Sequence, residues 1–466
     1  MKKLIKNGLV VLADCVEKAQ LLLESGKIQA IYKDGELTDE TDCEVIDASG
    51  RVVMPGMIDT HNHMCDPGPL NFREDWACGS KSAASGGITT ICDMPLPCEP
   101  EVLDEKSFQN KLAAVEAQSV VDFAFWAGFT PKNLGELKGL HELGCIGFKG
   151  FMCFATDSYP RITDSAMVEG FRKLAEFQGL GALHCENAEV AAEGQNRYSE
   201  LHWEDEACFD EARPWWVEYD AVQRSVLFAQ ETGARLEICH LSSVQTAEFL
   251  KQKKAQGNQV YVETCPHYLI FDKEVLRRVK AFGKCTPPFR SRENVEKLWD
   301  YVFDGTIDVI GSDHGPFTDE EKTEKKDFWK EYCGFGCNDV MLAALITEGV
   351  HKRGMSWPKL SRLISGNAAR MLGLYPRKGI LAPGADADII LIDPDKEWIY
   401  DGRKSFSKTK SERGVYQGFP LKGCVTHTLV RGELVYCDGE ILVPEGYGEF
   451  IRPVSSGKEA RETEDL

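Results

Sequence analysis

Short apolar, β-branched runs alternate with longer polar segments across most of the chain. Eight such runs follow one another between residues 52 and 315. Strands that alternate with helical segments indicate parallel βαβ units, and eight of them favour a closed barrel. The runs are VVMPGMIDTHNH, GITTICDMP, VDFAFWAGF, CIGFKGFM, GALHCEN, RLEICHLS, VYVETCPHYL and IDVIGSDHG.

The ends of these runs distinguish a closed barrel from an open, doubly wound sheet. Nearly every run begins with apolar residues and ends in His, Asp, Lys, Glu or Asn. Polar residues at the carboxyl ends of parallel strands are typical of a barrel whose chemistry lies at that face. We therefore predict an α/β protein with a (β/α)₈ TIM barrel over residues 53–374.

The two ends of the chain have a different pattern of short strands and tight turns. LIKNGLVVL, AQLLLESGKIQAIYKDG and EVIDASGRVVMPG precede the barrel, and KGILAPGADADIILIDPD and THTLVRGELVYCDGEI follow it. The RG and DG dipeptides in the last segment mark hairpins. We predict a small β-sandwich domain from residues 1–52 and 375–455, and a flexible polar tail at 456–466.

Composition and charge narrow the range of partners. The chain is 43% hydrophobic and 27% charged, as a large soluble enzyme requires, and its formal charge of −20 opposes binding to nucleic acid and anionic lipid. No apolar run reaches the ~20 residues of a membrane span, and no signal peptide begins the chain. We expect a cytoplasmic protein with a small-molecule partner, no nucleic-acid partner and no membrane partner.

Cysteine is abundant, with 17 residues scattered along the chain. An odd number at scattered positions is typical of buried thiols in a reducing compartment. The alternative is a cysteine metal site, but Cys333 and Cys337 have three residues between them and no second pair nearby. We interpret the cysteines as structural thiols.

Histidines gather at the ends of the predicted barrel strands. His61 and His63 end the first run, and residues two apart on a strand point the same way, so both imidazoles can hold one ion. An HxH pair also occurs by chance, but this pair directly follows an apolar strand. Among ten histidines, His184 and His240 also end runs. Together with Asp313 they form a ligand set suited to Zn²⁺ or a similar divalent ion, with room for two.

Two ions about 3.5 to 4 Å apart need a bridging anion. No acidic residue ends the fourth run, where Lys149 lies among apolar residues that disfavour its ammonium form. A neutral lysine amine reacts with CO₂ to give a carbamate, an anion with two oxygens. A lysine that snorkels or pairs with an acid remains the alternative.

Taken in order, these motifs resemble the cyclic amidohydrolases: allantoinases, hydantoinases, dihydropyrimidinases and dihydroorotases. The resemblance spans nearly the whole chain, from PGMIDTHNH through FKGFM, HCEN, HLSS, ETCPHYL, KCTPPFR and SDHGP to KGILAPGADADIILID. It implies two divalent ions, most often Zn²⁺ with Mn²⁺, Co²⁺ or Fe²⁺ as alternatives, and Lys149 as N6-carboxylysine. It also implies a homotetramer. His61, His63 and Asp313 would hold one ion, and His184 and His240 the other.

The resemblance also implies a mechanism. A hydroxide held between the ions attacks the ring carbonyl, and Asp313 passes the proton to the departing nitrogen. Backbone groups around Thr286 and Gly334 would bind the ring, with Phe335 beside it. His314 is interpreted as a neighbour that shapes the site.

Departures from the family patterns narrow the expected substrate. Cys65 stands where dihydroorotases have arginine, and Phe154 stands near the place of the hydantoinase tyrosine. HCEN, the ARP segment that ends at Pro214, and KCTPPFR resemble allantoinases, so we expect allantoin to be opened to allantoate. Pro97 and Phe335 depart from allantoinases, which keeps a hydantoinase or dihydropyrimidinase activity on another cyclic ureide or imide open.

Two other classes remain to be distinguished. Some relatives have lost metal ligands and serve as non-catalytic scaffolds, and phosphotriesterase-like barrels share the two-metal chemistry. All six expected ligands are present in this chain, which favours an enzyme, and the pattern of the terminal β domain favours the cyclic amidohydrolases.

Overall fold

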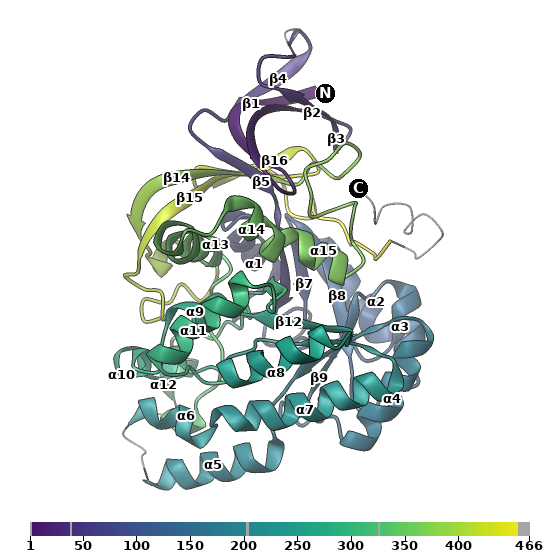
Figure 1. The fold of residues 1–466 in the computed structure, drawn as a ribbon, viewed down its shortest axis with the longest axis vertical. Helices are drawn as coiled ribbons and strands as arrows, with labels where there is room; N and C mark the ends of the chain where they lie inside the picture. Colours follow the sequence, from purple (N-terminus) through teal and green to yellow (C-terminus); the bar gives the residue numbers. More distant parts are fainter. Residues whose placement is uncertain (1, 38–39, 202–204, 325–326, 455–466) are drawn as a thin grey trace.

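A computed structural model describes residues 2–37, 40–201, 205–324 and 327–454. It has two parts, a barrel with helices around it and a sheet built from both ends of the chain, which lies at the top of Figure 1. The predicted tail at 456–466 lies outside the described residues. No described helix has both the length and the apolar character needed to cross a membrane.

The barrel is an eight-stranded sheet in which neighbours in space are neighbours in the chain, and the paired strands run parallel. All eight predicted runs form these strands, so the predicted barrel is confirmed. Its strands are β6 (Met57–Asn62), β7 (Ile88–Asp93), β8 (Asp122–Gly128), β9 (Gly147–Phe151), β10 (Leu180–His184), β11 (Arg235–Ile238), β12 (Val260–Thr264) and β13 (Val309–Ile310).

The barrel closes where its first and last strands meet. Asn62 forms a parallel bridge with His314, and the amide of His63 donates to the carbonyl of His314 over 2.9 Å. This closure brings the HxH pair beside the segment that carries Asp313.

Helices surround the barrel, and several of them, such as α1, α2, α4 and α11, begin at a polar side chain that caps the first turn. Asp104 precedes α2 and accepts a hydrogen bond from the amide of Ser107 over 2.8 Å, which satisfies a helix N-terminal donor. The longer helices are α1 (Trp76–Ser85), α2 (Glu105–Glu116), α3 (Leu137–Leu143), α4 (Asp164–Glu176), α5 (Ala188–Leu201), α7 (Trp215–Thr232), α8 (Val244–Ala255) and α11 (Arg292–Phe303). Shorter helices are α6 (Phe209–Ala212), α9 (Pro266–Ile270), α10 (Val275–Val279), α12 (Glu321–Glu324), α13 (Met341–Leu345), α14 (Trp357–Ser361) and α15 (Asn367–Met371).

The terminal segments form one continuous mixed sheet of nine strands, which confirms a β domain made from both ends of the chain. β5 pairs with β1 and with β14, so it joins the N-terminal strands to the C-terminal strands. The N-terminal part of the sheet therefore extends to Pro55. The strands are β1 (Lys2–Val11), β2 (Val16–Glu24), β3 (Lys27–Lys33), β4 (Cys43–Asp47), β5 (Val52–Pro55), β14 (Ile389–Ile399), β15 (Pro420–Val430), β16 (Glu433–Cys437) and β17 (Glu440–Ile441).

The hairpins of this sheet lie where the RG and DG dipeptides predict them. Arg431 and Gly432 connect β15 to β16, and Asp438 and Gly439 connect β16 to β17. All four residues have positive φ, as a two-residue type I′ turn requires. Beyond these strands the chain returns to the barrel, where the amide of Ile451 donates to the carbonyl of Phe123 on β8.

All seventeen cysteines are free thiols, and most of them are buried. This agrees with their interpretation as structural thiols.

Candidate active site

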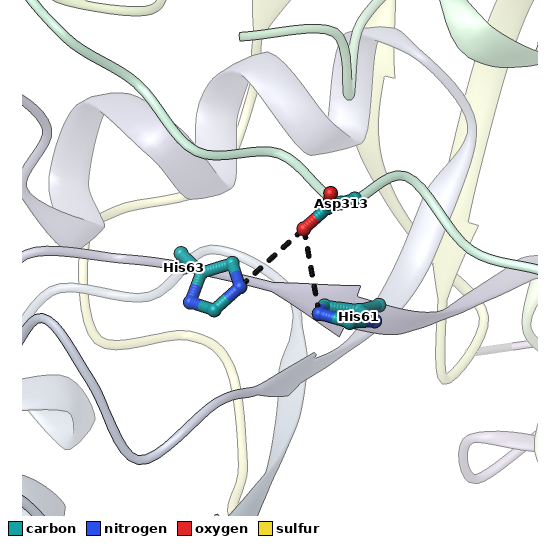
Figure 2. Close-up of side chains that lie close together, drawn as sticks. All are labelled: His61, His63 and Asp313. Atoms are coloured by element: carbon teal, nitrogen blue, oxygen red, sulfur yellow. Dashed lines mark ion pairs between the residues drawn. The ribbon is translucent and has the colours of Figure 1, made fainter. Parts of the chain in front are cut away.

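Two imidazoles and one carboxylate meet at the carboxyl end of the barrel. His61 lies in β6 and His63 just after it, while Asp313 follows β13 (Figure 2). Oδ1 of Asp313 lies 3.4 Å from Nε2 of His61 and 3.5 Å from Nε2 of His63. The spacing of two residues along a strand therefore directs both rings to one point, as the sequence predicts.

The opposite edge of each ring is already occupied. Nδ1 of His63 lies 2.8 Å from the carbonyl oxygen of Leu96, and Nδ1 of His61 lies 2.8 Å from Oε2 of Glu263. A carbonyl oxygen only accepts, so Nδ1 of His63 carries the hydrogen and Nε2 offers its lone pair. The carboxylate of Glu263 favours the same tautomer for His61. Such partners orient metal-binding histidines in general.

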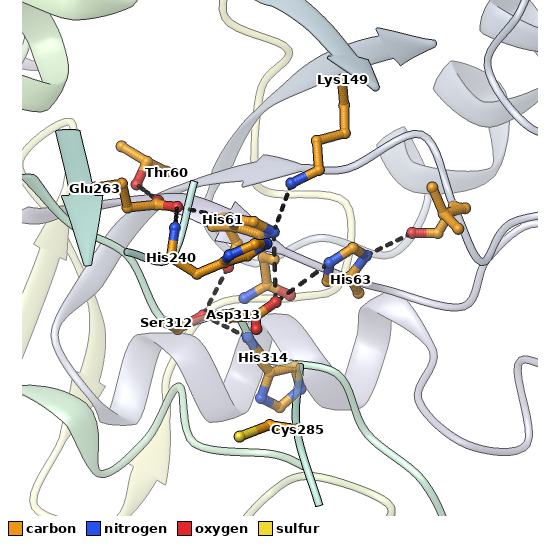
Figure 3. Close-up of polar contacts among 12 residues, drawn as sticks. Thr60, His61, His63, Lys149, His240, Glu263, Cys285, Ser312, Asp313 and His314 are labelled. Atoms are coloured by element: carbon orange, nitrogen blue, oxygen red, sulfur yellow. Dashed lines mark hydrogen bonds and ion pairs between the residues drawn. The ribbon is translucent and has the colours of Figure 1, made fainter. Parts of the chain in front are cut away.

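Lys149 joins this group from β9. Its Nζ lies 3.5 Å from Nε2 of His61, and its side chain is fully buried (Figure 3). Burial lowers the pKa of Lys149, but Cys239, Glu263 and Asp313 raise it more strongly, and the net pKa lies above the ordinary value. The expectation of a lowered pKa is corrected here, because it counted the apolar sequence neighbours and not the buried acids across the barrel.

His240 and His184 extend the cluster. The ring centroids of His63 and His61 lie 5.2 Å apart, those of His61 and His240 lie 5.3 Å apart, and those of His240 and His184 lie 4.6 Å apart. Burial, together with His184 and Lys149, lowers the pKa of His240 well below its ordinary value. His240 is therefore neutral, as a metal ligand must be.

Two of the candidate ligands lie in strained backbone. His240 has φ of 38° and Asp313 has φ of 49°, a region that residues other than glycine seldom adopt. The loop of Asp313 is fixed by Asp59, whose carboxylate accepts from the amide of Ser312 over 2.8 Å. Strain of this kind persists where the surrounding structure fixes it, and it gathers at functional sites.

His184 faces a buried ion pair. Its Nε2 lies 2.7 Å from Oε2 of Glu186, and both carboxylate oxygens of Glu186 also accept from the guanidinium of Arg213. Burial raises the pKa of Glu186, but Arg213 and His184 lower it far more, so this carboxyl is anionic.

The residues fit divalent metal ions. Nε2 of His61, Nε2 of His63 and Oδ1 of Asp313 converge, and donor atoms of these three residues lie within 4.8 Å of one another. Nδ1 of His240 is buried and has no hydrogen-bond partner among the residues that the structure describes. Buried polar atoms normally have a hydrogen-bond partner, so this unpartnered nitrogen is available to a metal. Imidazole nitrogens together with a carboxylate are the ligands that Zn²⁺ and related ions prefer.

A cavity of about 1160 Å³ opens above these side chains. All six predicted ligands line it, as do Thr286 and Gly334. The amide of Gly334 donates to the carbonyl of Lys284 over 2.8 Å, so this amide is already engaged within the protein. Gly334 has φ of 132°, and a Cβ there would lie 2.7 Å from the carbonyl oxygen of Gly315, so this close approach requires glycine.

Phe335 and Tyr159 lie away from the cavity wall. Phe335 is buried, and its ring stacks on Phe289 and contacts His267. It therefore supports the Gly334 loop from behind, and the cavity wall includes Pro97 and the exposed Phe154 instead. The hydroxyl of Tyr159 donates to the carbonyl of Lys149, so it is engaged below the cavity.

Sequence reasoning missed the residues that orient the ligands. Glu263 in ETCPHYL and Glu186 in HCEN both lie at strand ends, the same position that identified the histidines. This position at the end of a strand could have identified both acids as partners of the histidine ring nitrogens. His314 lies where the sequence suggests, with Nδ1 accepting from the amide of Cys337 over 3.0 Å.

The fold and the site together define a (β/α)₈ barrel with a candidate metal centre at the carboxyl ends of its strands. The chain belongs to the amidohydrolase family, whose model matches residues 52–435.

Several relatives are similar over almost their whole length. An allantoinase of Desulfitobacterium hafniense is 35% identical, with 97% of this chain and 98% of the relative covered. An L-hydantoinase of Paenarthrobacter aurescens is 33% identical, with 96% and 97% covered. Among solved structures, the L-hydantoinase (dihydropyrimidinase) from Arthrobacter aurescens has a TM-score of 0.93 at 32% identity, with 97% of this chain and all of that chain covered.

Proposed function

We propose that this protein is a metal-dependent hydrolase that opens a cyclic amide at its C–N bond, with allantoin as the first candidate substrate and allantoate as the product. The observation that carries the proposal is the convergence of Nε2 of His61, Nε2 of His63 and Oδ1 of Asp313 beside Nζ of Lys149. The similarity to an allantoinase at 35% identity supports the choice of ring.

In this proposal His61, His63 and Asp313 hold one divalent ion, and His184 and His240 hold the other. Zn²⁺ suits these ligands, and Mn²⁺, Co²⁺ or Fe²⁺ would also be accepted. Bound ions supply Lewis acidity toward the ring carbonyl and lower the pKa of water. The row of neighbouring rings from His63 to His184 supports two adjacent sites.

In this proposal Lys149, whose Nζ lies 3.5 Å from Nε2 of His61, would supply the anion that two neighbouring ions need. The neutral amine would attack the carbon of CO₂, so that a C–N bond forms while one C=O π bond breaks and its electron pair moves to oxygen. Loss of one proton from the nitrogen to solvent then yields N6-carboxylysine. The amine must lose its proton first, and the positive charge of ions bound beside it favours that loss.

Asp313 moves the proton. Burial raises its pKa, but the imidazoles of His61 and His63 lower it more, so the pKa lies well below the usual range and the group is anionic. It accepts a proton from the attacking water and delivers it to the ring nitrogen that departs. The ring opens to a linear acid, and backbone groups around Thr286 and Gly334 hold the polar edge of the ring.

A second candidate is a hydantoinase- or dihydropyrimidinase-type opening of another cyclic ureide or imide, such as a hydantoin with a bulky apolar substituent. The cavity volume of about 1160 Å³ exceeds what a ring the size of allantoin needs, and Phe154 at its wall is 72% exposed. An apolar wall beside the ring favours a substrate with an apolar substituent. The similarity to L-hydantoinases supports this alternative.

The proposal also carries three expectations about the protein's setting. The substrate is a small molecule, the protein is cytoplasmic, and by resemblance it forms a homotetramer. Analytical ultracentrifugation of the full chain tests the last of these.

Turnover of a substrate panel tests the proposed activity. Metal-loaded protein is incubated with allantoin, hydantoin, 5-benzylhydantoin, dihydrouracil and dihydroorotate, and ring opening is followed by chromatography. Preference for allantoin supports the first candidate, and preference for 5-benzylhydantoin supports the second. Failure to open any of these rings with two ions bound would contradict the proposed activity.

A further inference from the structure

Glu186 is a buried carboxylate that is absent from the cavity wall yet contacts a candidate ligand. It is 0% exposed, and its two oxygens accept three hydrogen bonds. Oε1 accepts from Nε of Arg213 over 2.9 Å, and Oε2 accepts from Nη2 of Arg213 over 2.7 Å and lies 2.7 Å from Nε2 of His184. A buried, fully bonded carboxylate has one fixed position.

This contact determines which nitrogen of His184 can bind an ion. A carboxylate only accepts, so Nε2 of His184 carries the hydrogen that is shared with Glu186. In the neutral ring, which is the form that binds a metal, the lone pair then resides on Nδ1. The ring of Phe151 stacks on the face of His184 with centroids 5.3 Å apart and planes inclined by 26°. One contact fixes the edge of the imidazole and the other fixes its plane.

The same network reaches the loop of the other ligand. The carbonyl oxygen of Arg213 accepts from Nη1 of Arg290 over 2.6 Å, and Nε of Arg290 donates to the hydroxyl of Ser242 over 3.1 Å. Ser242 lies two residues after His240 and is itself held by Glu218, whose carboxylate accepts from its amide and hydroxyl. A chain of buried hydrogen bonds therefore links the two loops that carry His184 and His240.

We infer that Glu186, held by Arg213, is the positioning residue of one ion site: it presents His184 as an Nδ1 ligand and keeps that ligand in register with His240. The rings of the other site, His61 and His63, are held by Glu263 and Leu96 instead. Oε2 of Glu263 also accepts from the amide of His240 over 3.1 Å, so Glu263 lies between the two sites, whereas Glu186 contacts His184. This inference rests on the proposed two-metal function. It predicts that the metal affinity of the His184 site depends on Glu186 more strongly than that of the His61 site.

Metal binding tests the inference without the use of turnover. Wild type and Glu186→Gln are equilibrated with a graded series of buffered Zn²⁺ concentrations. Bound zinc per chain is then measured by inductively coupled plasma mass spectrometry. Glutamine keeps the shape of the side chain but loses the charge that holds Arg213. We expect one site to bind as in wild type and the other to weaken about 10- to 100-fold, the usual cost of an outer-shell change.

Asp388→Asn is the matched control. Asp388 is also a buried carboxylate, and it accepts from Nζ of Lys378 over 2.5 Å near the start of β8, at the opposite end of the barrel from the candidate ligands. We expect this variant to bind two ions as wild type does. Wild-type zinc binding by both sites of Glu186→Gln would overturn the inference. A wild type that binds no zinc would contradict the proposed function itself.

A second measurement applies if Glu186→Gln does not fold. A crystal structure of zinc-loaded wild type with anomalous scattering locates both ions directly. An ion on Nδ1 of His184, with Nε2 still on Glu186, supports the inference. An ion on Nε2 of His184, or Glu186 displaced from the ring, overturns it.

Discussion

Nζ of Lys149 on β9 lies 3.5 Å from Nε2 of His61 on β6. The two strands are separated by β7 and β8 in the sheet, so the side chains meet across the interior of the barrel. This contact places a fully buried amine against one of the candidate metal ligands (Figure 3).

Reactivation of metal-free protein will depend on CO₂ if Lys149 is carboxylated. We expect zinc to restore activity slowly in CO₂-free buffer and faster when bicarbonate is added, because the carbamate forms from CO₂. The activity of Lys149→Ala should fall by at least roughly 10- to 100-fold, which is the cost of changing a residue that only orients a metal ligand. Bicarbonate should not restore this activity. Equal reactivation of wild type with and without bicarbonate would count against the carbamate.

Asp313→Asn removes both a ligand and the proton acceptor. General acid–base catalysis contributes typically about 10²- to 10⁴-fold, so we expect kcat to fall by at least that range. The melting temperature of the metal-free protein should change little, because Asp313 lies at the cavity and its loop is held by Ser312 and Asp59. A variant that retains more than a tenth of wild-type kcat would show that another group moves the proton.

Glu263→Gln is expected to weaken the ion held by His61. The carboxylate is fully buried, accepts from the hydroxyl of Thr60 over 2.6 Å and orients the His61 ring. We expect a loss of about 10- to 100-fold in affinity at this site. Zinc titration would detect this loss. Because Glu263 also accepts from the amide of His240, we expect both sites to weaken in Glu263→Gln, whereas Glu186→Gln should weaken the His184 site. Identical titrations of the two variants would refute this difference.

Zinc binding at the His184 site should depend on pH. Burial lowers the pKa of His184, but Cys153 and Glu186 raise it more, to about 9 in the metal-free protein. A metal needs the neutral imidazole, so binding releases a proton below this pKa. The apparent affinity should therefore rise with pH, by up to about tenfold per unit, and level off near pH 9. Calorimetry in buffers of different ionisation enthalpy measures the released proton, and the absence of release would contradict this prediction.

Pro97 and Phe335 should respond differently to substitution. Pro97 lines the cavity, so Pro97→Asn should change the ratio of kcat/KM between allantoin and 5-benzylhydantoin. Phe335 packs on Phe289 away from the wall, so Phe335→Leu should mainly lower stability, by about 1 kcal/mol for a volume-similar core change. Assays of both variants on the two rings test the assignment. A larger change in preference for Phe335→Leu than for Pro97→Asn would reverse it.

The sequence predicted the barrel because its periodicity is local. Each strand is a short apolar run, and each run ends in a polar residue, so the eight strands and the face that carries His61, His184 and Asp313 follow from the pattern alone. The RG and DG hairpins followed from turn chemistry in the same way.

Features that depend on contacts across the barrel were not predicted. The pKa of Lys149 depends on Cys239 and Glu263, which lie far from it in the sequence and meet it only in the closed barrel. The direction of Phe335 likewise depends on Phe289 and on the path of its loop. Such contacts have no local periodicity. The sequence showed that Glu263 and Glu186 lie at strand ends, but not which ring each of them orients.

The most direct test of the two-metal account is ring-opening activity measured against bound metal. Metal-free protein is loaded with increasing zinc in the presence of bicarbonate, and activity on the preferred ring is plotted against zinc per chain. The account predicts that activity is absent without zinc and reaches its plateau near two ions per chain. Full activity in the metal-free protein, or a plateau at one ion with no gain from the second, would contradict it.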